Sequence, residues 1–495
     1  MTDAASALPR LPYSFAKSQS IILGAREGGG LEAYVSENTP VLAIAEVRRF
    51  LGTTFELAVL DAASFERKLA DAYSRTDQTA AEVADDIGQD LDLSRLVQEL
   101  PPIEDLLEGE DDAPIIRMII ALLTQAVRED ASDIHIEPFE RHSSVRFRID
   151  GVLREVIQPH RALHAAMTSR IKIMAQLDIA EKRLPQDGRI TVRIAGRPID
   201  VRVSTIPATH GERVVLRLLD KDTARLMLDV LGMAQDTRAR IDVLIHRPHG
   251  ILLVTGPTGS GKTTTLYAAL SRLKAGELNI MTVEDPVEYD LSGIGQTQVN
   301  TRIDLTFAKA LRSILRQDPD VIMIGEIRDL ETAQIAVQAS LTGHLVLATL
   351  HTNDSASAVT RLVDMGVEPF LLASSLVGVL AQRLVRRLCL SCRQAYSPDA
   401  VELAQFEGME PPARLYRAVG CATCKSSGYQ GRMGIYELLE VDERLRHMIH
   451  ERVSDQVIRD HCLSGGALRS LKRDGMRWVA NGDTTLEEVL RVTRD

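Results

Sequence analysis

The sequence lacks the features that mark a secreted, membrane-spanning or nucleic-acid-binding chain. It has no apolar segment of the signal-peptide kind at its start and no uninterrupted apolar run long enough to span a bilayer. It has no excess of basic residues either, and its formal net charge of -11 argues against an extended nucleic-acid surface. We therefore expect a protein that is made and kept in the cytosol.

Cysteine is scarce, and its arrangement argues against a disulfide framework. Only five cysteines occur in 495 residues. Four of them form two C-x-x-C pairs, Cys389 with Cys392 and Cys421 with Cys424, a spacing that can place four thiolates round Zn²⁺. The doubled spacing disfavours the alternative of four reduced core cysteines. Because no histidine lies nearby and no ligand position stays open, we predict a structural zinc site. Cys462 stands alone and is expected to be a buried apolar residue.

The chain is too long for one compact domain, and two to four are expected. Between residues 82 and 112 the composition turns acidic, with Arg95 as the one basic residue and Pro101 and Pro102 interrupting any helix. This stretch predicts a linker. The resulting division is a small α/β module at 1–75, an acidic linker at 76–112, a second domain at 113–234 and a larger α/β domain at 235–495, which includes the cysteine module at 386–434 and C-terminal helices at 442–495.

The first module shows no chemistry of its own. Its pattern predicts strands at 20–23 and 55–60 and amphipathic helices at 40–50 and 62–73. It has no nucleophile, metal cluster or phosphate loop. A docking or structural role is therefore the better interpretation.

A phosphate loop organises the larger domain. Ile251 to Val254 predict a buried strand, residues 256–263 fit G-x-x-x-x-G-K-[ST], and a helix follows. Glycines let backbone N–H groups curl round phosphates, and the helix N-terminus adds partial positive charge. Lys262 is expected to reach the β- and γ-phosphates of ATP, and the Thr263 hydroxyl to ligate Mg²⁺. The predicted nucleotide-binding residues are Gly256, Pro257, Thr258, Gly259, Ser260, Gly261, Lys262, Thr263 and Thr264. A Gly-rich turn that binds nothing is disfavoured by the complete strand–loop–helix context.

Three further strands end in residues that suit a phosphate site. Glu284 follows a strand at 279–283, Glu326 follows a strand at 321–324, and His351 follows a strand at 345–350. The carboxyl ends of strands in an α/β sheet are where ligands bind, so His351 is a candidate phosphate-sensing residue. Strands alternate with helices here, which predicts a parallel, doubly wound sheet. Together with the phosphate loop, the acids predict nucleotide hydrolysis coupled to motion.

The second domain carries a row of arginines. We predict a helix at 114–129, a hairpin turning at Asp150 and Gly151, a helix at 162–176 and a meander of strands from 189 to 219. Arginines alternate with apolar residues along these strands, which places them on one face. An ordinary solvated face is one interpretation; beside a nucleotide domain, these guanidinium groups could instead reach a phosphate. The arginines are Arg146, Arg148, Arg193, Arg202, Arg213 and Arg217.

At this point the chain resembles the secretion ATPase superfamily that powers type II secretion and type IV pili. The four motifs of that family appear as GPTGSGKTTT at 256–265, VEDPVEY at 283–289, LRQDPDVIMIGEIRD at 315–329 and TGHLVLATLHTND at 342–354. The chain also resembles the second N-terminal domain of that family, in SDIHIEP at 132–138, RFRIDG at 146–151 and RLPQDGRI at 183–190. The tetracysteine module is similar to that of type II secretion and pilus-assembly members, and pilus-retraction members lack it. LPYSFAKSQSIIL at 11–23 resembles the N-terminal docking domain of the type II secretion protein E.

The resemblance implies a fold and an activity. The fold is a RecA-like P-loop NTPase core with a PAS-like α+β second domain, a small α/β docking domain and a zinc-binding insertion. The activity is hydrolysis of ATP with Mg²⁺ to power pseudopilus assembly and protein export. Glu284 or Glu326 would polarise the attacking water, and the sequence leaves both open. Arg202 and Arg217 match family arginines that neutralise charge on the γ-phosphoryl group. Gly325 stands where other P-loop enzymes have Asp, as is typical of the family.

The resemblance also implies partners. It predicts a homohexamer, peripheral to the cytoplasmic side of the inner membrane. Residues 1–75 would bind the inner-membrane type II secretion protein L, and the polytopic inner-membrane protein F is a further expected partner. No contact with nucleic acid and no direct membrane insertion are expected.

Two other classes of function compete with a type II secretion motor. The assembly motor of a type IV pilus shares its chemistry, and the N-terminal segment discriminates between the two. A DNA-binding recombinase or helicase of RecA-like fold is disfavoured by the net acidity and by the lack of a basic, aromatic-studded loop. A nucleotide-binding scaffold without catalysis is disfavoured because the acids that a hydrolase needs are present.

Overall fold

The computed structural model describes most of the chain after residue 112. The described residues are 113–194, 197–219, 227–406 and 408–494, together with 21–25, 31–36, 39–51, 55–61 and a few single positions before residue 70. They fall into two compact units, Met1–Lys221 and Asp222–Asp495, and each is described by itself. The predicted acidic linker lies outside the described residues, as does most of the helix predicted at 62–73. The predicted division into three domains and a linker stays a prediction.

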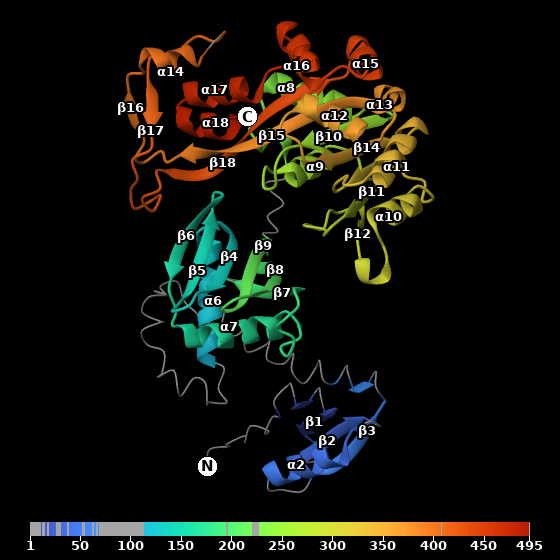
Figure 1. Ribbon diagram of the computed structural model, residues 1–495, viewed down its shortest axis with the longest axis vertical. Helices are drawn as coiled ribbons and strands as arrows, with labels where there is room; N and C mark the ends of the chain where they lie inside the picture. Colours follow the sequence, from blue (N-terminus) through green and yellow to red (C-terminus); the bar gives the residue numbers. More distant parts are fainter. Residues whose placement is uncertain are drawn as a thin grey trace. The chain divides into compact units, whose positions relative to one another are not determined.

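The N-terminal module is built on a three-stranded sheet (Figure 1). Strand β1 (Ile21–Ala25) pairs antiparallel with β2 (Leu31–Ser36), and β2 pairs in parallel with β3 (Glu56–Leu60). Helix α2 (Val41–Leu51) packs Val47 into the same core as Ile21 and Val35. The two predicted strands and the predicted helix at 40–50 are confirmed to within two residues. Strand β2, which joins the two strands into one sheet, was not predicted.

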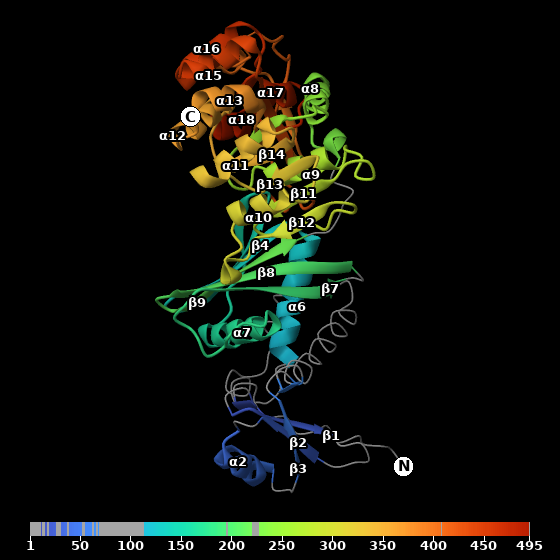
Figure 2. The ribbon, with the colours of Figure 1, turned by 90° about the vertical axis from the view of Figure 1, so that its right-hand side faces the viewer.

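The second domain has a six-stranded antiparallel sheet with two helices on one face (Figure 2). The strand order is β6-β5-β4-β9-β8-β7. Its elements are α6 (Ala113–Arg128), β4 (Ala131–Pro138), β5 (Ser143–Ile149), β6 (Val152–Ile157), α7 (Arg161–Met174), β7 (Gln186–Ile194), β8 (Arg197–Ala208) and β9 (Gly211–Leu219). Every element predicted here is present, with ends that differ by at most a few residues.

The alternating strand sequences explain why this sheet has two unlike faces. Side chains of successive strand residues point to opposite faces. Ile134, Phe147 and Leu216 belong to the buried core under the two helices, as do Ile119 of α6 and Met167 of α7. The arginines occupy the intervening positions, and therefore line the face that α6 and α7 leave open.

The C-terminal unit is built on a seven-stranded sheet, with strand order β12-β11-β13-β14-β10-β15-β18 (Figure 1). All neighbouring strands are parallel except β15 and β18, which are antiparallel. The predicted parallel, doubly wound α/β core is thus confirmed, and it carries one antiparallel edge strand. The strands are β10 (Gly250–Thr255), β11 (Ile280–Glu284), β12 (Gly295–Gln298), β13 (Val321–Ile324), β14 (Leu345–Leu350), β15 (Leu376–Leu388) and β18 (Tyr429–Glu440).

Helices cover both faces of this sheet, because its central strands are apolar on both sides. Leu252 and Val254 of β10 join one core with residues of α8 (Gln235–Ile245) and α9 (Lys262–Leu270). Ile251 and Leu253 join the opposite core. Helices that contribute to this second core are α10 (Phe307–Ile314), α11 (Leu330–Leu341), α12 (Ser355–Asp364), α13 (Pro369–Ser375), α15 (Glu443–His450) and α16 (Asp455–Ser464).

The cysteine module lies between the end of β15 and the start of β18, two long antiparallel strands. The chain between these strands forms a two-stranded sheet of β16 (Gln394–Tyr396) and β17 (Leu415–Arg417), with the short helix α14 (Ala400–Ala404). Helices α17 (Leu471–Ala480) and α18 (Leu486–Thr493) pack in a separate core with Val385 of β15 and Ile435 of β18. The long pairing of β15 with β18 was not predicted.

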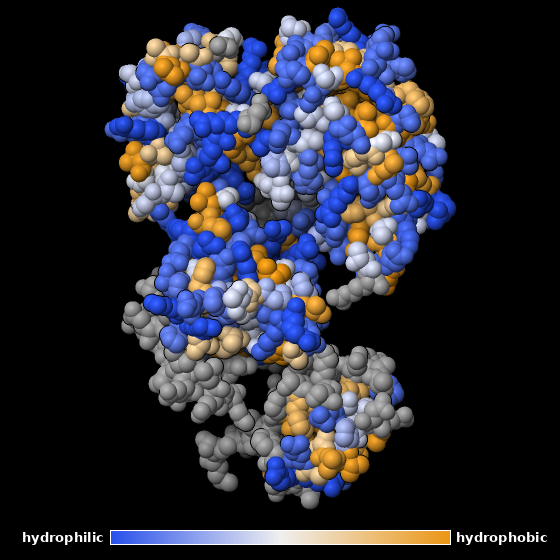
Figure 3. All heavy atoms as spheres, viewed as in Figure 1, coloured by the Kyte–Doolittle hydropathy of each residue, from blue (hydrophilic) through white to orange (hydrophobic). Residues whose placement is uncertain are grey.

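Figure 3 colours one face of the molecule by hydropathy. The face seen in Figure 3 is mostly hydrophilic, and its apolar residues form separate small groups. No helix among the described residues is long and apolar enough to cross a bilayer.

Candidate functional site

The phosphate loop connects β10 to α9, as the motif predicts. Gly261 has a φ of 87°, in the left-handed region that favours glycine, and α9 begins at the next residue. Ser260 Oγ is buried and meets no hydrogen-bond partner among the described residues. An unpaired buried hydroxyl beside a helix N-terminus suits an anionic ligand. The loop therefore fits the phosphate chain of a nucleotide, and Thr263 is the second residue of α9.

Lys262 is buried at the centre of this loop. Its Nζ donates to the carbonyl oxygens of Gly256, at 2.7 Å, and Pro257, at 3.1 Å. Burial lowers the pKa of Lys262 to about 8, an effect that the nearby Glu326 carboxylate opposes. The protonation of Lys262 therefore depends on the burial of its side chain and on the Glu326 carboxylate.

His351 and Glu326 lie beside this lysine. His351 Nδ1 is 3.5 Å from Lys262 Nζ, and His351 Nε2 is 3.5 Å from Glu326 Oε2. Burial, and then the charge of Lys262, lower the pKa of His351, which favours the neutral form of its ring. An ammonium group only donates, so Nδ1 accepts and the ring proton sits on Nε2, facing Glu326. Glu326 also forms an ion pair with Arg328. The residues that follow β10, β13 and β14 therefore meet at one edge of the sheet.

Glu284, the other predicted carboxylate, is held differently. It lies on β11, next to β13, but it is only 2% exposed. Its oxygens accept hydrogen bonds from the Tyr267 hydroxyl, from Thr282 Oγ1 at 2.5 Å and from Gln296 Nε2 at 3.0 Å. Burial and the Glu284 carboxylate raise the pKa of Tyr267, which keeps this phenol protonated as a donor. No local sequence pattern indicates these donors, because they come from three different elements.

The departure at Gly325 has a steric cause. A Cβ at this position would lie 3.3 Å from both the Glu284 Cα and the Val283 carbonyl oxygen. The amide of Gly325 also donates to that carbonyl at 2.8 Å. Glycine therefore lets the end of β13 lie close to the end of β11, and it leaves Glu326 as the acid that follows β13.

The four paired cysteines come together, as their spacing predicts. Their Sγ atoms all lie within 4.8 Å of one another, and no disulfide joins them. The Sγ atoms of Cys389 and Cys421 are 3.9 Å apart, those of Cys392 and Cys424 are 3.8 Å apart, and those of Cys421 and Cys424 are 3.7 Å apart. Four thiolates at about 2.3 Å from a tetrahedral zinc ion would be separated by about 3.8 Å. The donor set and its size fit Zn²⁺.

Backbone donors around the cysteines support this assignment. The amides of Cys421 and Gly428 each donate to Cys424 Sγ at 3.2 Å. Burial acts to raise the pKa of Cys424, but these N–H donors, together with the side chains of Cys421 and Cys392, lower the pKa to about 6. Metal binding requires the thiolate, so these donors favour the ligating form of Cys424, whereas burial raises the pKa of Cys392 to about 11.

Arg202 and Arg217 lie on neighbouring strands of the second domain. The register pairs Arg202 of β8 with Arg217 of β9, and Arg217 with Asp133 of β4. Arg217 Nε donates to Asp133 Oδ1 at 2.9 Å. The strand register places the other predicted arginines on this same face of the sheet. Acidic side chains lie among them, and Arg213 forms an ion pair with Glu137 at 2.9 Å. These acids hold the guanidinium groups in place, and half of the Arg217 side chain stays exposed.

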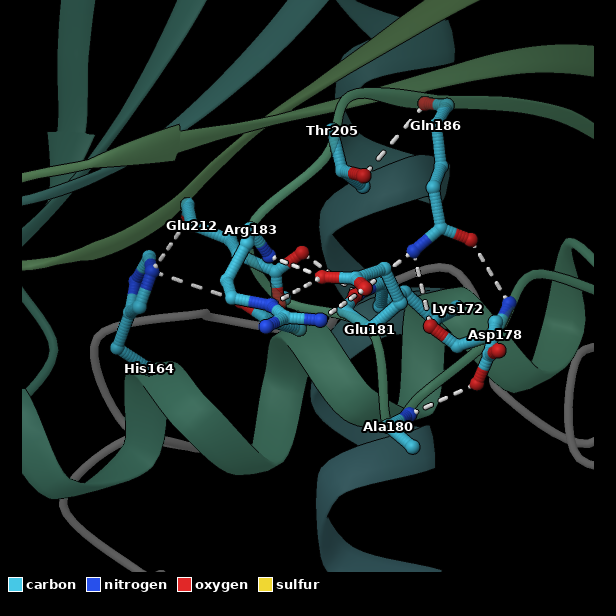
Figure 4. Close-up of polar contacts among 10 residues, drawn as sticks. His164, Lys172, Asp178, Ala180, Glu181, Arg183, Gln186, Thr205 and Glu212 are labelled. Carbon is cyan, nitrogen blue, oxygen red and sulfur yellow. Dashed lines mark hydrogen bonds and ion pairs between the residues drawn. The ribbon is translucent and has the colours of Figure 1, made fainter.

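The RLPQDGRI run of the second domain spans the end of a loop and the first residues of β7, and hydrogen bonds hold this loop in place (Figure 4). The fully buried Lys172 of α7 donates to Glu212 Oε1 at 2.6 Å and to the Glu181 carbonyl oxygen at 2.7 Å. Gln186 closes the loop, since its Nε2 donates to the carbonyl oxygens of Asp178 and Glu181, both at 2.9 Å. This run therefore contributes to the structure of the loop through contacts that the motif alone does not reveal.

Comparison with known proteins identifies the family of the chain. Residues 108–491 match the family described as type II/IV secretion system protein, and residues 10–73 match an N-terminal domain family of GSPII protein E. The type II secretion system protein HxcR of Pseudomonas aeruginosa is 61% identical over 98% of this chain and 99% of that protein. The type II secretion system ATPase E of Vibrio cholerae is 55% identical over 98% of this chain and 97% of that protein.

Two solved structures with a similar fold are an ATPase and a pilus retraction motor. The Legionella pneumophila ATPase DotB is 20% identical with a TM-score of 0.57, and the alignment covers 76% of this chain and 94% of DotB. The pilus retraction motor PilT, solved with bound ADP, is 26% identical with a TM-score of 0.50, and the alignment covers 76% of this chain and 96% of PilT. These likenesses support the RecA-like fold of the core.

Proposed function

The chain belongs to the type II/IV secretion system protein family, and we propose that it hydrolyses ATP to drive pseudopilus assembly and protein export by a type II secretion system. The observation that carries the proposal is the convergence of Lys262, His351 and Glu326 at the phosphate loop. Full-length relatives named for type II secretion support the choice of machine.

Each residue of the site has a proposed part in hydrolysis. The loop amides and Lys262 bind the β- and γ-phosphates, and the Thr263 hydroxyl holds Mg²⁺. Mg²⁺, when bound, neutralises charge on the phosphate oxygens. Glu326 is proposed to face the γ-phosphate, and His351 lies 3.5 Å from both the Glu326 carboxylate and Lys262 Nζ. Glu284 supplies a second carboxylate on the neighbouring strand.

Arg202 and Arg217 are proposed to act on the nucleotide from the second domain. Both belong to a face of guanidinium groups in a domain without a phosphate loop of its own. They would neutralise charge that develops on the γ-phosphoryl group. The Arg217 guanidinium donates to the Asp133 carboxylate. The planar group that binds a carboxylate in this way also suits a phosphate.

The proposal places the protein at a membrane machine through a partner. The match of residues 10–73 to the N-terminal domain family of GSPII protein E supports a docking role for residues 1–75, with the inner-membrane protein L as the partner. It also favours type II secretion over the pilus-assembly alternative. A homohexamer on the cytoplasmic side of the inner membrane, with protein F as a further contact, completes the proposal.

Purified protein tests the enzymatic part directly. We expect ATP hydrolysis that requires Mg²⁺ and falls by about a hundredfold or more in Lys262→Ala and in Glu326→Gln, while the melting temperature stays close to that of the unmodified chain. Gln338→Ala, an exposed change on α11, is a control that should keep full turnover. Turnover at the unmodified rate in either site variant would contradict the assigned roles.

A further inference from the structure

A glutamine outside the known motifs contacts the phosphate loop. Gln382 lies on β15 and is only 2% exposed. Its Nε2 donates to the Ser260 carbonyl oxygen at 2.7 Å, and its Oε1 accepts from the Thr265 hydroxyl at 2.7 Å. Ser260 belongs to the loop and Thr265 to the first turns of α9. One side chain thus ties the phosphate loop to the helix that follows it.

The backbone of the loop is shaped round this glutamine. A Cβ at Gly256 would lie 2.4 Å from the Gln382 carbonyl oxygen, and a Cβ at Gly261 would lie 2.8 Å from Gln382 Nε2. Both distances are too short for a real side chain. The Gly256 contact is with the backbone of β15 and would arise with any residue at position 382, whereas a Cβ at Gly261 would displace the Gln382 amide.

The hydrogen bonds fix which way the amide points. A backbone carbonyl only accepts, so the Ser260 oxygen needs the Nε2 end of Gln382. The amide is buried, and loss of either bond would leave a polar group unpaired, which is costly inside a protein. β15 pairs with β10 up to Ala381 and Thr255, so the strand that enters the phosphate loop also sets the position of Gln382. The pairing of β10 with β15 therefore holds Gln382 beside the loop.

We propose that Gln382 is a positioning residue for phosphate binding: it holds the loop between Ser260 and Lys262 in the conformation that receives the nucleotide. The inference rests on the proposed function only for the identity of the ligand. Gln382 does not reach the reacting atoms itself, so its effect is on ground-state and transition-state binding alike. Such a uniform effect raises KM and leaves kcat nearly unchanged.

Two substitutions at Gln382 test the proposal. Gln382→Met keeps the length of the side chain and removes both hydrogen bonds. Gln382→Glu keeps an acceptor for Thr265 but places an oxygen against the Ser260 carbonyl. We expect KM for MgATP, and Kd for a fluorescent ADP analogue, to rise about tenfold in Gln382→Met and further in Gln382→Glu, with kcat within about twofold. A tenfold change in Kd corresponds to about 1.4 kcal/mol.

Controls separate positioning from lower stability. Val489→Ala removes packing from α18, in the core that does not include the loop. If it lowers the melting temperature as much as Gln382→Met, it should reduce the active fraction, hence kcat, and leave KM unchanged. If Gln382→Met fails to fold, Thr265→Val removes one anchor of Gln382 and should raise Kd about threefold. Unchanged KM and Kd in the Gln382 variants would overturn the proposal. Binding of the ADP analogue stays measurable even if the chain proves not to hydrolyse ATP, so the two proposals fail separately.

Discussion

At the scale of single residues, the site combines groups that the sequence identifies with groups that it does not. Lys262 and Thr263 follow from the loop motif, and Glu326 and His351 follow from their places after apolar strands. The donors that surround Glu284 do not, because Tyr267, on α9, is 17 positions from Glu284 and belongs to another element. Gln382 is 122 positions from the loop residue that it holds. Contacts between distant elements carry no local sequence pattern.

The buried lysine predicts a pH dependence of nucleotide binding. The pKa of Lys262 is lowered to about 8, and only the charged ammonium attracts phosphate. Affinity should therefore be complete well below pH 8 and be lost as the pH rises through this value, by about tenfold between pH 7 and pH 9. In Lys262→Arg the guanidinium stays charged across this range. We expect Kd for ADP, measured by calorimetry, to be flat in that variant. A flat Kd in the unmodified chain would contradict the account.

The arginines of the second domain predict a division between binding and turnover. In Arg217→Ala we expect kcat to fall by about a thousandfold, the range in which arginines act on γ-phosphate in other NTPases, while Kd for ADP changes little. Arg217→Lys should not restore turnover, because an ammonium lacks the planar fork. Arg193→Ala, on the same face at the edge strand β7, is the matched control and should keep full activity. Normal turnover in both Arg217 variants would show that these arginines form an ordinary solvated face and do not act on the nucleotide.

At the scale of elements, the predictable parts are those with local patterns. Strands β10, β13 and β14 are continuous apolar runs between motifs, and their bounds agree with prediction to within one residue. The pairing of β15 with β18 was not predictable in this way, because a module of some forty residues separates the two strands and nothing local indicates that they pair. This pair is nevertheless the element that joins the zinc module to the phosphate loop through Gln382.

The zinc module predicts a metal-dependent element. We expect about one Zn²⁺ per chain by elemental analysis, and loss of most of it in Cys421→Ser. Because metal binding supplies folding energy to such a module, the variant should also expose the chain between β15 and β18 to proteolysis. Cys462→Ser, which changes the fifth cysteine in α16, is the control and should keep its zinc. Protein purified without chelator that holds no zinc would overturn the assignment.

At the scale of the whole molecule, the family was accessible from sequence because its motifs are spread over the chain. The phosphate loop alone indicates only an NTPase, whereas the acids, the histidine motif, the tetracysteine module and the N-terminal segment together indicate a secretion ATPase. The comparisons confirm this family over nearly the full length. The choice between a type II secretion system and a pilus rests on relatives named for type II secretion and on the match of the N-terminal segment. It does not follow from the nucleotide site, because the two kinds of motor share that chemistry.

The most direct test of the account is the amount of exported protein that reaches the medium. It would be measured in cells whose own type II secretion ATPase gene has been replaced by the gene for this chain. We expect secretion with the unmodified chain. None is expected with Lys262→Ala, which lacks the phosphate-binding cation, and none with a chain without residues 1–80, which should keep ATP hydrolysis but lose its docking module. Secretion by the Lys262→Ala chain at the level of the unmodified chain would contradict the central claim that ATP hydrolysis at this loop drives export.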